Sequence, residues 1–97
     1  MPRVTTHPGE VLREEFMIPL GLSANALALD LHVPANRISA LANGTRAVTA
    51  DTALRLSRYF GTTPVFWLNL QSVYDLSLAQ AENGNRVKVE VRPREMP

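Results

Sequence analysis

The stretch that decides the fold is Ser23–Ala42, which reads SANALALDLHVPANRISALA. It contains two short segments with apolar residues at helical spacing, 23–31 and 34–42, and only His32 and Val33 separate them. Pro34 predicts an immediate restart, because proline suits the first position of a helix. Two short helices on so tight a turn cross at a steep angle, which is the helix-turn-helix geometry. The residues expected to face inward are Leu27, Ala28, Leu31, Ile38 and Leu41.

Prolines and glycines mark three further helices on either side of this stretch. Proline precedes and glycine follows most of the apolar-periodic segments, so we expect helices over 8–17, 50–60 and 64–83 as well. Ser23, Thr49 and Thr63 are the expected N-caps. The chain is therefore predicted to be all-α, with five helices in one domain over 1–83 and a tail over 84–97. The residues that set these limits are Pro8, Pro19, Gly21, Pro34, Gly44, Gly61, Pro64 and Gly84.

The predicted helix 64–83 is apolar around nearly its whole circumference. Such a helix must be buried on more than one side, and a chain of 97 residues has little protein with which to do so. It is either a central core helix, or it packs one face on the bundle and another on a second copy of the chain. The pattern favours the second, a homodimer. The candidate interface residues are Phe66, Trp67, Leu70, Val73 and Tyr74. Trp67 lies inside the most apolar helix, which favours the core or the dimer interface over a platform on which bases stack.

The tail contains an alternating pattern from Arg86 to Arg92, in which Val87, Val89 and Val91 alternate with charged residues. Alternation of this kind is typical of a strand, and a lone strand has nothing to pair with in a helical domain. We expect the tail to be either disordered or an edge that pairs with a partner chain.

The composition excludes several classes of protein. The chain has no cysteine, which excludes a disulfide scaffold and Cys-type zinc or iron–sulfur sites. No apolar run approaches the roughly 20 residues of a membrane span, and the first ten residues lack a secretory apolar core, so the expected location is the cytoplasm. His7, expected at an N-cap or turn, and His32 lie on separate elements, and the common nucleotide and nucleophile motifs are absent. We therefore expect no enzyme, no metal and no cofactor.

The outward face of segment 34–42 carries residue types that read DNA. In a helix-turn-helix the second helix lies in the major groove, with its N-terminal residues at the base edges. Asn36 can pair with adenine through two hydrogen bonds, Arg37 with guanine or a phosphate, and small side chains permit contact with a thymine methyl. Residues 32–60 carry four arginines against Asp51 alone, a local charge of +3 in a chain of net charge +1. The candidate DNA-contacting residues here are Pro34, Ala35, Asn36, Arg37, Ser39 and Ala40.

Two flanking features predict phosphate contacts. The loop after the second helix offers backbone N–H groups and the side chains of Asn43, Thr45 and Arg46, which are usual phosphate anchors. Ser23 opens the first helix of the pair, and a helix N-terminus attracts phosphate. The alternative is an ordinary amphipathic helix with a polar solvent face. The near-neutral total charge predicts weak non-specific binding, so that specific binding needs both halves of a dimer.

Four stretches carry a family resemblance: HPGEVLREEF from His7, LSANALALDLHVPANRIS from Leu22, NGTRAVTADTALRLSRYFG from Asn43 and TTPVFWLNLQSVYDL from Thr62. Together they cover roughly residues 7–76. With these stretches the chain resembles the HigA-type antitoxins, also called VapI-like, within the lambda-repressor-like (XRE) helix-turn-helix family. A generic XRE domain has neither TADTALRLSRYFG nor FWLNLQ in that spacing.

The resemblance implies a five-helix DNA-binding domain that dimerises and binds a palindromic operator. It also implies a small ribonuclease toxin, HigB-like, which the antitoxin neutralises while the pair represses its own promoter. Two positions depart from the family pattern: Ala24 stands where many relatives have glutamine, and His32 where many have glycine at the turn. A non-glycine residue there must tolerate a left-handed backbone. A stand-alone regulator without a toxin, or a helix-turn-helix scaffold that binds only protein, remain alternatives.

Overall fold

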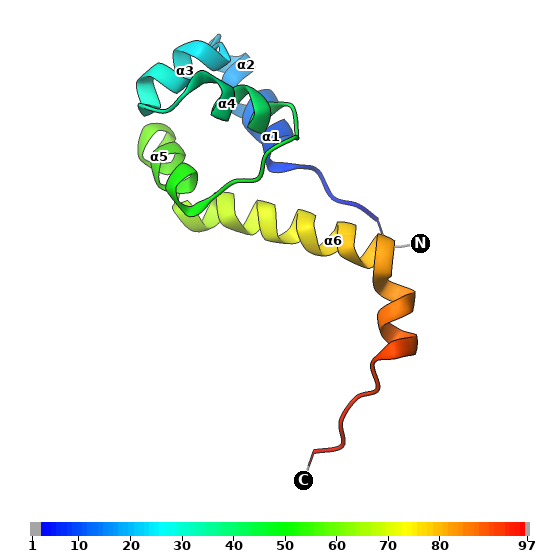
Figure 1. The fold of residues 1–97 in the computed structure, drawn as a ribbon. Helices are drawn as coiled ribbons and strands as arrows, with labels where there is room; N and C mark the ends of the chain where they lie inside the picture. The colour runs from blue at the N-terminus through cyan, green and yellow to red at the C-terminus, as the bar shows by residue number, and fades with distance from the viewer. Residues whose placement is uncertain (1–2, 97) are drawn as a thin grey trace.

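Short helices gather at one end of a long last helix (Figure 1). The computed structural model describes residues 3–96. The first rod of α1, η1 and α2 is continuous, so the described residues form five helical rods and no strand, and the all-α prediction is confirmed. The elements are α1 (Pro8–Val11), the π-helical turn η1 (Leu12–Met17), α2 (Ile18–Leu20), α3 (Ala24–Leu31), α4 (Ala35–Ala42), α5 (Ala50–Phe60) and α6 (Pro64–Glu90).

Local capping explains where α3, α5 and α6 begin. The side-chain oxygens of Ser23, Thr49 and Thr63 each accept a hydrogen bond from the backbone N–H three residues later. These three predicted N-caps are confirmed. Pro34 differs by one position, because its extended backbone (φ −60°, ψ 143°) makes it the N-cap of α4 and not its first residue.

The first rod is longer than predicted. It passes Met17 and Pro19 and ends only at Gly21, whose φ is 66°. A proline inside a helix removes one hydrogen bond and crowds the carbonyl four residues earlier. The π-helical turn in front of Pro19 relieves this crowding, because its bonds span five residues, as in the bond from the N–H of Ile18 to the carbonyl of Arg13.

The core lies where the short helices meet the first half of α6. Trp67 is fully buried, with its ring centroid 5.2 Å from that of Phe16 and 5.0 Å from that of Phe66. Its Nε1–H donates to Oγ1 of Thr62 at 2.8 Å. Trp67 therefore belongs to the core of a single chain and offers no surface to a second copy, unlike the other interface candidates. The other large side chains that are fully buried are Pro8, Leu12, Leu27, Ile38, Leu41 and Leu56.

Helix α6 continues to Glu90, well beyond its predicted end at Asn83, and the strand prediction for 86–92 is wrong. Because no strand lies beside it in residues 3–96, this segment satisfies its backbone groups along its own chain. Arg86 also pairs with Glu90 one turn later, at 2.9 Å. Gly84 does not stop the helix, since an interior glycine costs only about 1 kcal/mol relative to alanine.

The C-terminal half of α6 projects from the bundle and changes direction on its way out (Figure 1). The radius of gyration is 16.6 Å, against about 13 Å for a compact chain of this length. The backbone N–H of Thr5 donates to Oγ of Ser77 at 3.0 Å, which ties the N-terminal segment to the middle of α6. Within residues 3–96, neither α6 nor any shorter helix combines the length and hydropathy that a membrane crossing requires.

Candidate nucleic-acid interface

The turn between α3 and α4 is built around His32. Its backbone is left-handed (φ 58°, ψ 46°), and the N–H groups of His32 and Val33 donate to the carbonyls of Leu29 and Ala28. This is the Schellman arrangement that normally uses glycine. A non-glycine residue in this conformation costs about 1 kcal/mol. The turn keeps its geometry without glycine and brings α4 in immediately after α3.

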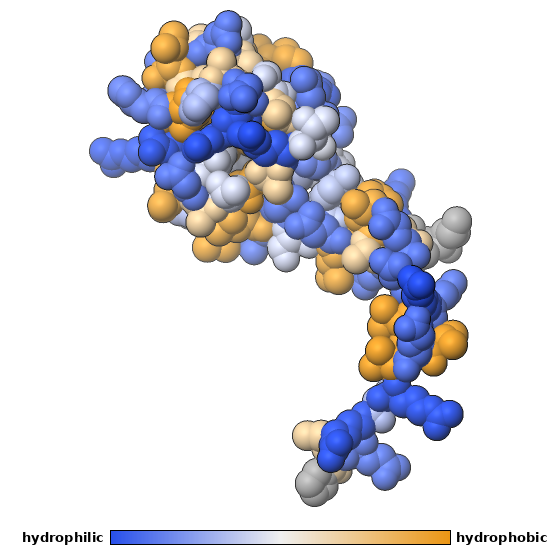
Figure 2. Space-filling view, viewed as in Figure 1, coloured by the Kyte–Doolittle hydropathy of each residue, from blue (hydrophilic) through white to orange (hydrophobic). Residues whose placement is uncertain are grey.

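The N-terminal end of α4 is open to solvent. Pro34, Ala35 and Asn36 are exposed, while Ile38 points into the core. The amide of Asn36 presents a donor and an acceptor together. The other three α4 candidates, Arg37, Ser39 and Ala40, are half-buried. Figure 2 shows hydrophilic side chains gathered over the end of the molecule that α3 to α5 form.

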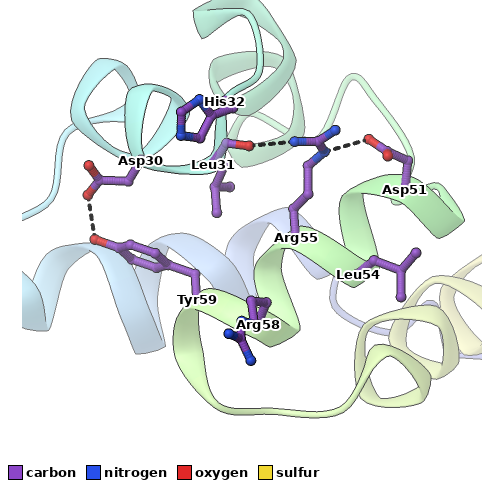
Figure 3. A pocket seen from close by; sticks show the side chains of 8 residues that line it. All are labelled: Asp30, Leu31, His32, Asp51, Leu54, Arg55, Arg58 and Tyr59. Atoms are coloured by element: carbon purple, nitrogen blue, oxygen red, sulfur yellow. Dashed lines mark hydrogen bonds and ion pairs between the residues drawn. The ribbon is translucent and has the colours of Figure 1, made fainter.

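Arg37 is held by an ion pair that its position in the sequence does not reveal. Its Nη1 donates to Oδ2 of Asp51 at 2.8 Å, and the same oxygen accepts from Nε of Arg55 at 2.9 Å. Nη1 of Arg55 also donates to the carbonyl of Leu31 at 2.9 Å (Figure 3). The hydrogen bond from Arg55, with help from Arg37, lowers the pKa of Asp51, so this carboxylate is ionised at neutral pH.

The loop after α4 offers fewer free donors than the sequence predicts. The backbone N–H groups of Asn43, Gly44 and Thr45 all donate back to carbonyls of α4, and Oγ1 of Thr45 does the same at 3.1 Å. The side chains of Asn43 and Arg46 are exposed. Ser23 is exposed too, with its oxygen engaged as the cap of α3. The loop therefore offers the side chains of Asn43 and Arg46 as anchors, while the backbone N–H groups of its first three residues are already engaged.

Gln71 of α6 fixes the far end of this loop. It is buried, and its Oε1 accepts from the backbone N–H of Val48 at 2.8 Å. Its Nε2 donates to Oδ1 of Asp75 at 2.9 Å. Sequence reasoning missed this residue. Its place in the apolar run FWLNLQ could have revealed it, because a glutamine among buried residues needs hydrogen-bond partners for its amide.

The start of the first rod lies directly against the end of α4. A Cβ atom on Gly9 would lie 1.7 Å from the carbonyl oxygen of Leu41, so only glycine permits this approach. Nη1 of Arg13 donates to the carbonyl of Ala42 at 2.9 Å. Nδ1 of His7 accepts from the N–H of Gly9 at 2.9 Å, and burial lowers the pKa of His7 against an opposing effect of Asp75. The C-terminal turn of α4 is thus held by the N-terminal rod.

An apolar groove of about 390 Å³ runs between the N-terminal segment and α6. Val73 is 53% exposed and Phe66 37% exposed, so this part of α6 leaves apolar surface uncovered. Tyr74 is half-buried and meets the ring of His7 edge-on, with centroids 4.9 Å apart. Three of the predicted interface residues, Phe66, Leu70 and Val73, line this groove together with Thr5, Thr6, Val11 and Asn69.

A second groove, of about 410 Å³, lies between the end of α3 and α5 (Figure 3). Most of its charged groups bind one another: besides the Arg55 contacts, the hydroxyl of Tyr59 donates to Oδ2 of Asp30 at 2.6 Å. That hydrogen bond raises the pKa of Tyr59. Within residues 3–96, no group of three or more side chains is arranged to hold a metal ion.

Comparisons with known proteins agree on one architecture. A family model described as helix-turn-helix matches residues 12–68. Virulence-associated protein I of Dichelobacter nodosus is 54% identical over 82 residues, which span 84% of this chain and 74% of that protein. The solved structure of an addiction module antidote protein of the HigA family from Coxiella burnetii is 52% identical, with a TM-score of 0.87 over 92% of this chain and 97% of that one. The Pseudomonas aeruginosa antitoxin HigA, solved with the higBA promoter, is 42% identical, with a TM-score of 0.90 over 98% of this chain and 100% of that one.

Proposed function

The chain belongs to the helix-turn-helix family, among its HigA-type antitoxins, and from that membership we propose that it is a repressor that binds its own promoter as a dimer. One observation carries the proposal: the exposed N-terminal end of α4, where Pro34, Ala35 and Asn36 stand beside Arg37. The structure of the Pseudomonas aeruginosa relative with the higBA promoter supports it.

In the proposed complex α4 lies in the major groove. Asn36 pairs with an adenine, and Arg37, the next residue of α4, pairs with a guanine. Ser23, Asn43 and Arg46 contact phosphates and set the register. Because Asp51 neutralises one of the arginines beside α4, few net positive charges face the phosphates, and non-specific affinity is low.

Replacement of Asn36 by alanine tests the assignment of α4. We expect Asn36→Ala to weaken binding to a duplex from the promoter upstream of the gene by about 5- to 150-fold, which corresponds to the 1–3 kcal/mol of one bidentate base contact. The measurement is a titration by fluorescence anisotropy at fixed salt. Asn85→Ala, the same change on the exposed part of α6, is the matched control and keeps wild-type affinity.

Two outcomes of this titration contradict the proposal at different levels. Equal affinity of Asn36→Ala and wild type shows that α4 does not read bases at this position. If the wild-type chain binds the promoter duplex no better than a shuffled duplex, operator binding itself fails, and a scaffold that binds only protein takes its place.

We propose that the dimer forms through the groove between the N-terminal segment and α6. Phe66, Leu70 and Val73 line it, and an apolar surface of this kind on a small chain is typical of an interface. A two-fold dimer places two recognition helices about 34 Å apart, in successive major grooves of a palindromic operator.

Introduction of a charge in this groove tests the interface. We expect Val73→Asp to raise the dimer dissociation constant at least about tenfold, because an unpaired carboxylate would be buried between the copies. Sedimentation measures this: the wild type runs at twice the chain mass at micromolar concentration, and the variant shifts towards the monomer. Ser72→Asp, which adds the same charge at the neighbouring exposed position, remains a dimer. A wild type that sediments as a monomer contradicts the proposed dimer.

We also propose the antitoxin role, in which the chain binds and neutralises a small HigB-like ribonuclease in the cytoplasm. The similarity to proteins described as HigA antitoxin and HigA-family antidote supports it. The adjacent reading frame is the direct test: a gene for a small basic ribonuclease-like protein beside this one, whose toxicity co-expression of this chain abolishes, is the expected result. An isolated gene points to a stand-alone regulator.

A further inference from the structure

An acidic residue at a DNA-binding surface needs an explanation. Asp51 is the only acidic residue between positions 32 and 60, it lies in the first turn of α5, and its side chain is 54% exposed. Near phosphate oxygens a carboxylate is repelled. The charge of Asp51 alone therefore weakens the proposed complex. A favourable role for Asp51 has to come from its hydrogen bonds.

Asp51 is itself fixed from two sides. Its Oδ2 accepts from Nε of Arg55, and Arg55 is in turn fastened to the carbonyl of Leu31 at the end of α3 (Figure 3). The last carbonyls of a helix lack partners within the helix, so this bond stabilises the end of α3 as well. The carboxylate is thus placed relative to both α3, which precedes the recognition helix, and α5, which follows it.

Arg37 donates to Asp51 through one nitrogen, and within residues 3–96 the other N–H groups of its guanidinium make no hydrogen bond. A guanidinium has five N–H donors in one plane, and only Nη1 contacts Asp51. The neighbouring Nε and Nη2 groups form the pair of parallel donors that matches O6 and N7 of guanine. A long arginine side chain loses rotamer freedom when it binds, and this loss is smaller if the side chain is already held in place.

We propose that Asp51 is a positioning residue: it binds Nη1 of Arg37 and orients the guanidinium so that Nε and Nη2 contact a guanine of the operator through two hydrogen bonds. This inference rests on the proposed DNA-binding function. It makes Asp51 a determinant of sequence specificity that acts through Arg37 and touches no base. The opposing idea is that Asp51 is only a negative charge that limits affinity for any DNA.

The two ideas predict opposite signs. If Asp51 positions Arg37, Asp51→Asn weakens binding to the promoter duplex at least about fivefold, because a bidentate contact is lost or loosened. The same variant binds a shuffled duplex about twofold more tightly, because one repelling charge is gone. If Asp51 is only a charge, both affinities rise together. Glu82→Gln, which removes the same charge from the exposed part of α6, serves as control and changes neither affinity.

Two further variants keep the test decisive. Asp51→Glu retains the charge and displaces the carboxylate, so it should weaken only the promoter complex. If circular dichroism shows that Asp51→Asn is unfolded, Asp51→Glu takes its place in the test. In an Arg37→Ala background, Asp51→Asn should lower promoter affinity no further. A rise of both affinities, no change in either, or a promoter loss that persists without Arg37 each overturns the inference. Failure of the wild type to prefer the promoter duplex counts against the proposed function and not against this step.

Discussion

Trp67→Ala is expected to lower the free energy of unfolding by about 3–5 kcal/mol. The indole is fully buried in the core and contacts the rings of Phe16 and Phe66. Truncation leaves a cavity between α6 and the first rod and also leaves the hydroxyl of Thr62 without its donor. For a domain of this size, with 5–15 kcal/mol of total stability, the change removes a large part of it.

Urea unfolding followed by circular dichroism measures this loss, at one protein concentration because a dimer makes stability depend on concentration. Trp67→Phe, which keeps an aromatic ring and loses the Nε1–H donor, should fall between wild type and Trp67→Ala. Val89→Ala on the projecting part of α6, at a side chain 82% exposed, should change stability by less than about 0.5 kcal/mol. A cost below about 1.5 kcal/mol for Trp67→Ala contradicts the central place of this residue in the core.

Most helix limits could be predicted because short-range bonds decide them. Ser23, Thr49 and Thr63 each cap a helix through a hydrogen bond to a residue three positions away, and the sequence contains that information in full. The left-handed His32 is of the same kind: the turn is so short that whichever residue occupies it must adopt that backbone.

What the sequence does not reveal depends on distant partners. Arg37 looks like a free cation in the sequence, yet Asp51, fourteen positions along the chain, holds it. Gln71 binds Val48 across 23 positions. The end of α6 was mispredicted for a related reason, since an alternating valine pattern favours a strand only where another strand is available to pair with it, and none lies beside it in residues 3–96.

Gly9→Ala is expected to destabilise the chain by about 3 kcal/mol, although it adds only one methyl group. The new Cβ would lie 1.7 Å from the carbonyl oxygen of Leu41 and 2.7 Å from its carbon. Both are backbone atoms, so no side-chain rotation relieves the clash, and the cost lies at the upper end of the range for an overpacked site. Gly84→Ala is the matched control with the opposite sign: its Cβ meets nothing within 4 Å inside α6, and alanine there should stabilise the helix by about 0.5–1 kcal/mol.

The same clash links the first rod to DNA binding. To make room for the methyl group, α1 must move away from the last turn of α4, which also strains the bond from Arg13 to the carbonyl of Ala42. That turn leads directly into Asn43 and Arg46, the proposed phosphate contacts. We therefore expect Gly9→Ala to lower the melting temperature by more than about 10 °C and, below that temperature, to weaken binding to the promoter duplex, while Gly84→Ala keeps full affinity. Wild-type stability of Gly9→Ala contradicts the close packing of α1 on α4. If Gly9→Ala is destabilised but binds promoter DNA with wild-type affinity, the first rod supports the fold without setting the position of the phosphate contacts.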